Sequence, residues 1–289
     1  MPLTIDFRNK LVLITGGGRG IGLAISTALA QAGADLAITY TSTDASPVAD
    51  KLSNEYGVTV KAFKCEVTKS KEVDRVVEEV GKVFGKEVDI GVANAGVSLW
   101  KDAHENTDAD IQNIFAVNTY HPYYLSRALV RSWLHLPIPV SSSSSDSSSP
   151  SKEDLDIPSI KGLNLKKQIL FVSSISALVA MNPQRQTAYN ASKGAVTMMA
   201  KSLAGEWSHL GISVNSVSPG YVSTDMIASP PDATAASWVS EWEKRTPVGR
   251  FASPAEIGEF IAVLLSEKMG GGGFMVGSDV VVDGGYTVF

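Results

Sequence analysis

Short apolar segments alternate with segments of helical periodicity along almost the whole chain. The apolar segments are rich in branched residues and bounded by glycine or polar residues, which predicts buried strands. These strands are expected over residues 10–15, 35–40, 58–64, 88–93, 168–173, 212–217 and 279–282. Helices are expected over residues 20–32, 70–84, 108–133, 187–209 and 254–266. Because alternating strands and helices build parallel sheets covered on both faces, the pattern predicts one α/β domain over residues 1–289, with a doubly wound parallel sheet.

One segment, residues 135–166, interrupts the alternation. It combines a serine tract with four prolines and few residues that build a core. Such a composition buries too little apolar surface to offset the entropy lost on ordering, so we expect a largely disordered surface insertion. Its serines are candidates for phosphorylation, although a tolerated loop is the simpler interpretation. The sequence leaves open whether this insertion borders the functional site.

The first predicted strand runs directly into a glycine-rich loop, and a helix follows it. Glycines in such a loop let the backbone approach a pyrophosphate, and the helix N-terminus supplies oriented N–H groups. The spacing Gly16-x-x-x-Gly20-x-Gly22 differs from the more common G-x-G-x-x-G pattern. A glycine-rich hairpin is the alternative, which the flanking strand and helix disfavour. We therefore predict a Rossmann-type dinucleotide-binding sheet.

The second predicted strand ends at Tyr40, followed by Thr41 and Ser42. A site specific for NAD would place an acid here for the ribose 2′-hydroxyl, whereas the first acid in this chain is Asp44. Arg19, inside the glycine loop, is a cation placed to meet a 2′-phosphate. The sequence thus favours NADP(H) over NAD(H), unless Arg19 is an ordinary surface residue.

Tyr189 and Lys193 are four residues apart in a predicted helix and therefore share one helix face. An ammonium group about 4 Å from a phenol favours the phenolate by about 4 kcal/mol, or about three pKa units, before burial opposes it. A tyrosine of this kind can pass a proton near neutral pH, as carbonyl reduction requires.

Charge and composition exclude several classes of function. The net charge of −5 and the absence of a basic run give nucleic-acid binding no electrostatic support. No apolar stretch has membrane-spanning length, no signal-peptide pattern is present, and the four histidines lack the spacing of metal ligands. The single cysteine, Cys65, fits a reducing compartment and is interpreted as a buried, inert thiol. We expect a cytoplasmic protein without a metal site.

Taken in order, the motifs resemble the short-chain dehydrogenase/reductase family from Lys10 to Tyr286, apart from the serine-rich insertion. The matching pieces are Thr15-Gly16-x-x-x-Gly20-x-Gly22, Asn94-Ala95-Gly96, Asn118, Ser174, Tyr189-x-x-x-Lys193, Pro219-Gly220 and the closing VDGGY. Within the family, DIGVANAG, SSISALVAMNPQRQTAYNASKGAV and SLAGEW look most similar to fungal polyol and ketose reductases, including mannitol, arabinitol and sorbose/xylulose enzymes.

This resemblance implies a role for each catalytic candidate. Tyr189 would protonate the carbonyl oxygen during reduction or act as the base in oxidation. Lys193 would lower the pKa of Tyr189 and hold the nicotinamide ribose, and Asn118 would anchor a water of a proton relay. Ser174 would donate a hydrogen bond to the substrate oxygen. The cofactor contacts implied are Gly16, Gly18, Arg19, Gly20, Ile21, Gly22, Tyr40, Thr41, Ser42, Glu66, Val67, Asn94, Ala95, Gly96, Tyr189, Lys193, Pro219, Gly220, Val222 and Thr224.

The chain departs from the usual family pattern at three points. Ala93 stands where asparagine is common, and Glu66 where aspartate is common; both changes are compatible with the fold. The usual interval from the catalytic serine to the tyrosine would select Ser176. The strand-end motif FVSS instead selects Ser174, which we favour because the end of a strand fixes a side chain better than a loop does.

The resemblance implies an NADP(H)-dependent oxidoreductase that reversibly reduces a ketone, here a ketose, to a secondary alcohol or polyol by hydride transfer. A 3-oxoacyl thioester or bulky-ketone reductase is the alternative, and a non-catalytic NADP(H) sensor is a more remote one. The resemblance also implies a lid over the substrate, formed by residues 221–250. Trp238 and Trp242 share one helix face in this lid, where they either line the substrate pocket or pack the lid onto the body. A homotetramer, or else a dimer, is implied by helices 108–133 and 187–209 and by the C-terminal segment.

Overall fold

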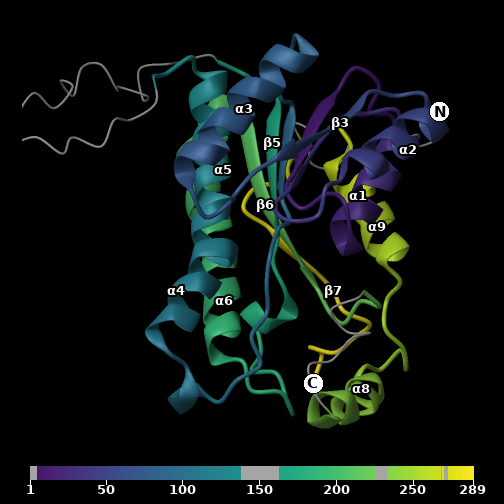
Figure 1. The fold of residues 1–289 in the computed structure, drawn as a ribbon, viewed down its shortest axis with the longest axis vertical. Helices are drawn as coiled ribbons and strands as arrows, with labels where there is room; N and C mark the ends of the chain where they lie inside the picture. The colour runs from purple at the N-terminus through teal and green to yellow at the C-terminus, as the bar shows by residue number, and fades with distance from the viewer. Residues whose placement is uncertain (1–4, 138–162, 225–232, 268, 270–272) are drawn as a thin grey trace, which may run out of the picture.

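The computed structural model describes residues 5–137, 163–224, 233–267, 269 and 273–289. Within them, seven parallel strands form one sheet in the order β3-β2-β1-β4-β5-β6-β7 (Figure 1). The strands are β1 (Leu11–Ile14), β2 (Asp35–Tyr40), β3 (Val60–Lys64), β4 (Ile90–Ala93), β5 (Lys167–Val172), β6 (Ile212–Pro219) and β7 (Asp279–Val282). The prediction of a doubly wound parallel sheet of the Rossmann type is confirmed.

Helices cover both faces of this sheet (Figure 1). They are α1 (Gly20–Gln31), α2 (Ser46–Tyr56), α3 (Ser70–Phe84), α4 (Asp108–Phe115), α5 (His121–Trp133), α6 (Thr187–Trp207), α8 (Ala233–Arg245) and α9 (Pro254–Leu265). Short helical turns are η1 (Ala103–Glu105), η2 (Ala116–Tyr120), η5 (Ile175–Ala177) and η6 (Ser208–Leu210). Helices α1 and α9 pack on one side, and α3, α5 and α6 on the other.

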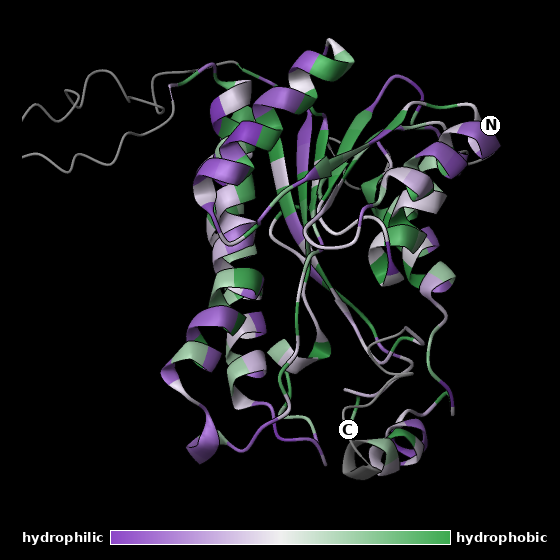
Figure 2. Ribbon diagram, viewed as in Figure 1, coloured by the Kyte–Doolittle hydropathy of each residue, from purple (hydrophilic) through white to green (hydrophobic). Residues whose placement is uncertain are grey.

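The two faces of the sheet bury separate hydrophobic cores. Alternate residues of β1 point to opposite faces, so Leu11 and Leu13 belong to the core under α3, α5 and α6, whereas Val12 and Ile14 belong to the core under α1 and α9. All four side chains are fully buried, which explains why the strand is apolar throughout instead of alternating. Each such side chain contributes about 1.5–3 kcal/mol by leaving water. Apolar residues accordingly gather on the strands and the helix faces toward them (Figure 2).

Several details differ from the sequence-based prediction. Helix α2 was not predicted, because its central residues, ADKLSNE, are mostly polar and bury only Ala49 and Leu52. The helix expected over 108–133 is divided by η2, a turn of π-helix. Cys65 is buried, as predicted, and burial raises the pKa of its thiol to about 12.

The predicted insertion, residues 135–166, lies mostly outside the described residues. The described residues at its two ends are hydrogen-bonded to the neighbouring chain: the backbone N–H of Leu136 donates to the carbonyl of Arg131, and that of Leu165 donates to the carbonyl of Leu210. Among the described helices, none is long and apolar enough to cross a membrane. The same residues contain no group of three or more His, Cys, Asp or Glu side chains that could hold a metal ion.

Candidate active site

The order of the strands reverses between β1 and β4, and the loops after these two strands are joined by hydrogen bonds. The hydroxyl of Thr15 accepts from the backbone N–H groups of Asn94, at 3.0 Å, and Ala95, at 3.2 Å. The side-chain amide of Asn94 donates to the carbonyls of Thr15 and Gly16 at 3.0 and 3.2 Å. Open α/β sheets bind ligands at such a reversal, outside the carboxyl ends of the strands. The contacts of Asn94 therefore brace the crevice where a dinucleotide would lie.

The glycine loop leaves no room for side chains at three of its positions, Gly17, Gly18 and Gly22. A Cβ on Gly22 would lie 2.1 Å from the carbonyl oxygen of Gly16, and a Cβ on Gly18 would lie 2.8 Å from Cβ of Ala45. Gly16 and Gly20 adopt positive φ angles of 64° and 53°, which glycine adopts without strain. This loop is therefore a close-packed backbone surface that ends at the start of α1.

The N-terminus of α1 suits an anionic ligand. Arg19 occupies the N-cap position, its side chain makes no capping hydrogen bond, and the first turn contains no acidic residue. The helix dipole and the backbone N–H groups thus face the loop without a competing carboxylate. These features fit the pyrophosphate of a dinucleotide, and the exposed side chain of Arg19 lies beside them.

Five further predicted cofactor contacts, Tyr40, Thr41, Ser42, Glu66 and Val67, lie at or just after the carboxyl ends of β2 and β3. The hydroxyl of Thr41 donates to the carbonyl of Cys65 at 2.9 Å, which links the two strand ends. Tyr40 hydrogen-bonds to Asp44, Ser42 is exposed, and Val67 is buried. The carboxylate of Glu66 accepts from the hydroxyl of Thr68 at 2.8 Å.

Asn118 lies in η2, and both the oxygen and the nitrogen of its side-chain amide are hydrogen-bonded. Its Oδ1 accepts from the N–H of Val97, and its Nδ2 donates to the carbonyl of Val97, both at 2.9 Å. Nδ2 also donates to the hydroxyl of Ser192 at 3.1 Å. A Cβ on Gly96 would lie 3.4 Å from Oδ1 of Asn118 and 3.6 Å from Nζ of Lys193. The structure thus brings Asn118, Gly96 and Lys193 together.

Tyr189 and Lys193 lie one turn apart near the start of α6. The Nζ atom of Lys193 is buried, donates to the carbonyl of Val172 at 2.9 Å, and lies 5.7 Å from the centroid of the Tyr189 ring. Val172 is the last residue of β5, so this hydrogen bond fixes the helix against the end of the strand that precedes Ser174.

The pKa of Tyr189 shifts opposite to the direction that the spacing alone predicted. Burial raises the pKa of the phenol above its ordinary value, and the hydrogen bond from Ser174 offsets only part of this rise. Burial also lowers the pKa of Lys193 to about 8. The ammonium is bonded to Val172 rather than to the phenol, so desolvation dominates. Without a bound cofactor, Tyr189 is therefore a neutral acid at neutral pH.

Two serines compete for the catalytic position, and their contacts differ. Ser174 follows the end of β5, hydrogen-bonds to Tyr189, and accepts from the N–H of Ser176 at 3.1 Å. The hydroxyl of Ser176 instead accepts from Nε2 of Gln186 at 3.0 Å and is buried beneath the loop before α6. The geometry favours Ser174 as the residue that meets a substrate oxygen beside Tyr189.

Four predicted cofactor contacts, Pro219, Gly220, Val222 and Thr224, lie at the end of β6 and just after it. The N–H of Gly220 donates to the carbonyl of Val282 at 2.9 Å, and a Cβ at this position would lie 2.8 Å from Cα of Asp283. Pro219 pairs with Val282 in the sheet, and Val222 is buried. A Cβ on Gly20 would lie 3.6 Å from Cγ2 of Thr224, which places Thr224 over the glycine loop.

An aromatic cluster, which the sequence indicated only in part, connects α8 to the body of the protein. Trp242 is fully buried and stacks on Tyr221 with ring centroids 4.8 Å apart, and Trp100 packs edge-on against both Trp238 and Trp242. Gln184 links the cluster: its Oε1 accepts from the indole N–H of Trp242, and its Nε2 donates to the hydroxyl of Tyr221, both at 2.7 Å. Trp242 therefore packs α8 onto the body. Residues 225–232 of the expected lid lie outside the described residues.

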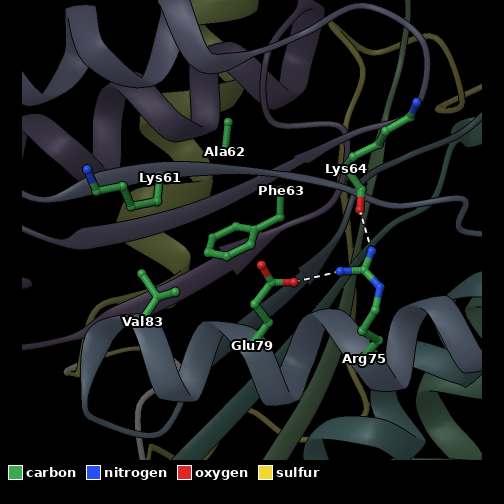
Figure 3. A pocket seen from close by; sticks show the side chains of 7 residues that line it. All are labelled: Lys61, Ala62, Phe63, Lys64, Arg75, Glu79 and Val83. Atoms are coloured by element: carbon green, nitrogen blue, oxygen red, sulfur yellow. Dashed lines mark hydrogen bonds and ion pairs between the residues drawn. The ribbon is translucent and has the colours of Figure 1, made fainter.

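A surface groove lies away from this site, between the edge strand β3 and α3 (Figure 3). Its lining includes Lys64, Arg75 and Glu79, and Arg75 donates to the Lys64 carbonyl at 2.8 Å and to the Glu79 carboxylate at 2.6 Å. Because the guanidinium is already bonded to both groups and partly exposed, these contacts have a structural explanation. None of the predicted site residues lines this groove.

Comparison with known proteins agrees with the motifs. Residues 10–143 match the family model for short chain dehydrogenase, and residues 160–287 match the model for enoyl-(acyl carrier protein) reductase. A sorbose reductase of Candida albicans is 35% identical over 98% of this chain and 88% of its own length. A probable NADP-dependent mannitol dehydrogenase of Yarrowia lipolytica is 33% identical over 97% of this chain and 88% of its own.

Among solved structures, L-sorbose reductase from Gluconobacter frateurii, complexed with NADPH and L-sorbose, aligns with a TM-score of 0.79. It is 27% identical and the alignment covers 98% of each chain. The sequence similarity extends over nearly the full length, and the strand order and the motifs agree with it. The chain belongs to the short-chain dehydrogenase/reductase family of oxidoreductases.

Proposed function

We propose that this protein is an NADP(H)-dependent reductase that converts a ketose to a polyol, and that it catalyses the reverse oxidation as well. The observation that carries the proposal is the cluster of Ser174, Tyr189, Lys193 and Asn118 beside the glycine loop, at the edge where the sheet order reverses. The names of the sorbose and mannitol relatives support the substrate class and the choice of NADP(H).

In the proposed mechanism, each side chain acts on one part of the reaction. A bound reduced nicotinamide would supply the hydride. Tyr189 donates its phenolic proton to the carbonyl oxygen, for which its raised pKa keeps it protonated. Ser174 donates a hydrogen bond to the same oxygen and stabilises developing negative charge there. Lys193 places a positive charge near the phenol as the proton leaves, and Asn118 holds η2 against Val97.

The proposal is tested by the oxidation of NADPH and NADH in the presence of fructose, sorbose, xylulose, a cyclic diketone and an acetoacetyl thioester. We expect turnover with NADPH and at least one ketose. Turnover with the thioester or the diketone alone would replace the ketose by the alternative substrate class. NADPH binding without turnover of any carbonyl compound would contradict catalysis and favour a cofactor sensor.

The replacement Arg19→Ala should weaken the binding of NADPH but not that of NADH. We propose that Arg19 meets the 2′-phosphate, because the side chain stands at the uncapped start of α1. Loss of a charge-assisted hydrogen bond raises a dissociation constant by about 10-fold to 100-fold. Titration by quenching of tryptophan fluorescence should show this rise for NADPH and no more than about a 3-fold change for NADH. An unchanged NADPH preference in the variant would remove Arg19 from this role.

The rate of ketone reduction should fall at alkaline pH. Lys193 is charged below its lowered pKa of about 8 and neutral above it, whereas Tyr189 keeps its proton beyond neutral pH because its pKa is raised. The positive charge of Lys193 stabilises the phenolate that Tyr189 becomes when its proton leaves. This charge is lost as the pH rises through about 8. Measurement of kcat at constant ionic strength from about pH 6 to about pH 10 checks this. A reduction rate that rises throughout this range would contradict it.

We further propose that the active form is a cytoplasmic homotetramer. Exposed apolar side chains on neighbouring helices support association: Tyr120 and Tyr123 are 49% and 42% exposed beside α4 and α5, and Met198 of α6 is 60% exposed. The C-terminal Val288 and Phe289 are exposed as well. Light scattering after size exclusion should give about four times the chain mass of 30.6 kDa at micromolar concentration. A monomeric mass would contradict the proposal.

A further inference from the structure

The turn η2 leaves one backbone carbonyl without its normal partner. In this π-helical turn the N–H of His121 donates to the carbonyl of Ala116, five residues earlier. By the same spacing, the carbonyl of Val117 would accept from residue 122, but Pro122 has no N–H. Val117 is half-buried, and a carbonyl without a donor is unfavourable there, so a donor from a side chain would stabilise the turn.

The imidazole of His121 supplies that donor. Its Nδ1 lies 3.3 Å from the carbonyl oxygen of Val117, and because a carbonyl only accepts, Nδ1 carries the proton. The ring is fully buried, and its Nε2 has no hydrogen-bond partner at ordinary distance within the described residues. The backbone of Ala95 contributes only a weaker polar interaction with the ring than Val117 does, so the bond to Val117 decides which nitrogen carries the proton. Burial, together with the nearby charge of Lys193, lowers the pKa of His121 to about 4. His121 is thus a neutral imidazole with one fixed N–H donor.

The carbonyl that His121 satisfies precedes Asn118 directly. Asn118 reaches Val97 and Ser192 from within η2, so a change in the turn would move the amide that holds these contacts. The backbone of Ala95 also lies near the His121 ring, which therefore contacts the segment between β4 and Val97 as well.

We propose that His121 is a positioning residue: its Nδ1–H replaces the N–H that Pro122 lacks, and thereby holds η2 in the form that places Asn118 beside Lys193. The inference rests on the proposed function for its catalytic consequence, but its structural part stands on the hydrogen bonds alone. His121 acts through Asn118 and touches no reacting atom.

Three variants test this position. His121→Leu removes the donor, and we expect kcat to fall by about 10-fold to 100-fold through displacement of Asn118, with the KM for the ketone changed by less than about 3-fold. His121→Asn places an amide N–H near the position of Nδ1 and should keep kcat within about 3-fold of wild type. The double variant His121→Leu/Pro122→Ala restores a backbone N–H at residue 122, so it should recover most of the lost activity.

Ser126→Ala is the matched control. Ser126 is fully buried in α5, and its hydroxyl donates to the carbonyl of Pro122 at 2.8 Å. Its replacement removes a hydrogen bond of the same kind, from a side chain to a carbonyl four residues earlier, without affecting the Val117 carbonyl. We expect it to lower the melting temperature and to leave kcat within about 2-fold of wild type.

Crystal structures of His121→Leu and of the double variant test the role of His121 without any measurement of activity. We expect a displaced Asn118 in the first and a π turn with Asn118 bonded to Val97 in the second. The inference is overturned if Asn118 keeps its contacts in His121→Leu, or if His121→Asn and the double variant are both as impaired as His121→Leu. If the wild-type protein reduces no ketone, the proposed function fails, and the two structures still decide the role of His121.

Discussion

Replacement of Tyr189 by phenylalanine is expected to lower kcat for ketone reduction by about 1,000-fold, because it removes the acid that we propose protonates the carbonyl oxygen. The ring that packs beside Lys193 remains, so the fold and the cofactor crevice are kept. Stopped-flow or steady-state oxidation of NADPH gives kcat, and fluorescence titration gives the dissociation constant of NADPH. We expect that constant to change by less than about 3-fold.

The two readouts separate loss of chemistry from loss of binding. A variant that binds NADPH normally but turns over slowly supports the role of Tyr189 as the acid. If Tyr189→Phe retained more than about a tenth of the wild-type kcat, another group would have to donate the proton and the mechanism would be wrong.

Ser174→Ala is expected to lower kcat by about 100-fold, with Ser176→Ala as its matched control. Ser174 hydrogen-bonds to Tyr189 and lies two residues after the end of β5, so its hydroxyl is positioned to stabilise charge on the substrate oxygen. Ser176 lies two residues later and its hydroxyl is already bonded to Gln186. Removal of that hydroxyl should destabilise the loop and change kcat by less than about 3-fold.

The stability and the activity of the same two variants together test which serine is catalytic. Thermal denaturation, followed by circular dichroism, is expected to show the larger loss of stability for Ser176→Ala, because its hydroxyl is buried and bonded. A large loss of kcat in Ser176→Ala together with full activity of Ser174→Ala would exchange the roles of the two residues.

Most of the fold was predictable because buried parallel strands leave a simple pattern. The four residues of β1 are apolar without exception, since each faces a helix-covered side of the sheet, and the same reason makes β4 and β5 recognisable. Helix α2 was missed because it buries only two side chains. The π turn was missed because a helical period does not distinguish spacings of four and five residues over one turn. Pro122 in mid-helix was the available signal.

At the site, sequence motifs located the candidate residues but did not predict their pKa shifts or their hydrogen-bond partners. The spacing of Tyr189 and Lys193 placed both on α6, but the sign of the tyrosine's pKa shift depends on burial and on the bond from Lys193 to Val172. Thr15 was recognised as part of a motif, although its two backbone contacts after β4 needed the folded chain. Gln184 belongs to no motif, and its bonds to Trp242 and Tyr221 connect segments far apart in sequence.

The most direct test of the account is the transfer of deuterium to a ketose substrate from NADPH that carries deuterium at both hydrogen positions of the nicotinamide C4. Hydride transfer predicts a polyol with one deuterium on the carbon that was the carbonyl, seen by mass spectrometry and NMR, at a rate that Tyr189→Phe reduces about 1,000-fold. Consumption of labelled NADPH without deuterium in any polyol would contradict the proposed reaction.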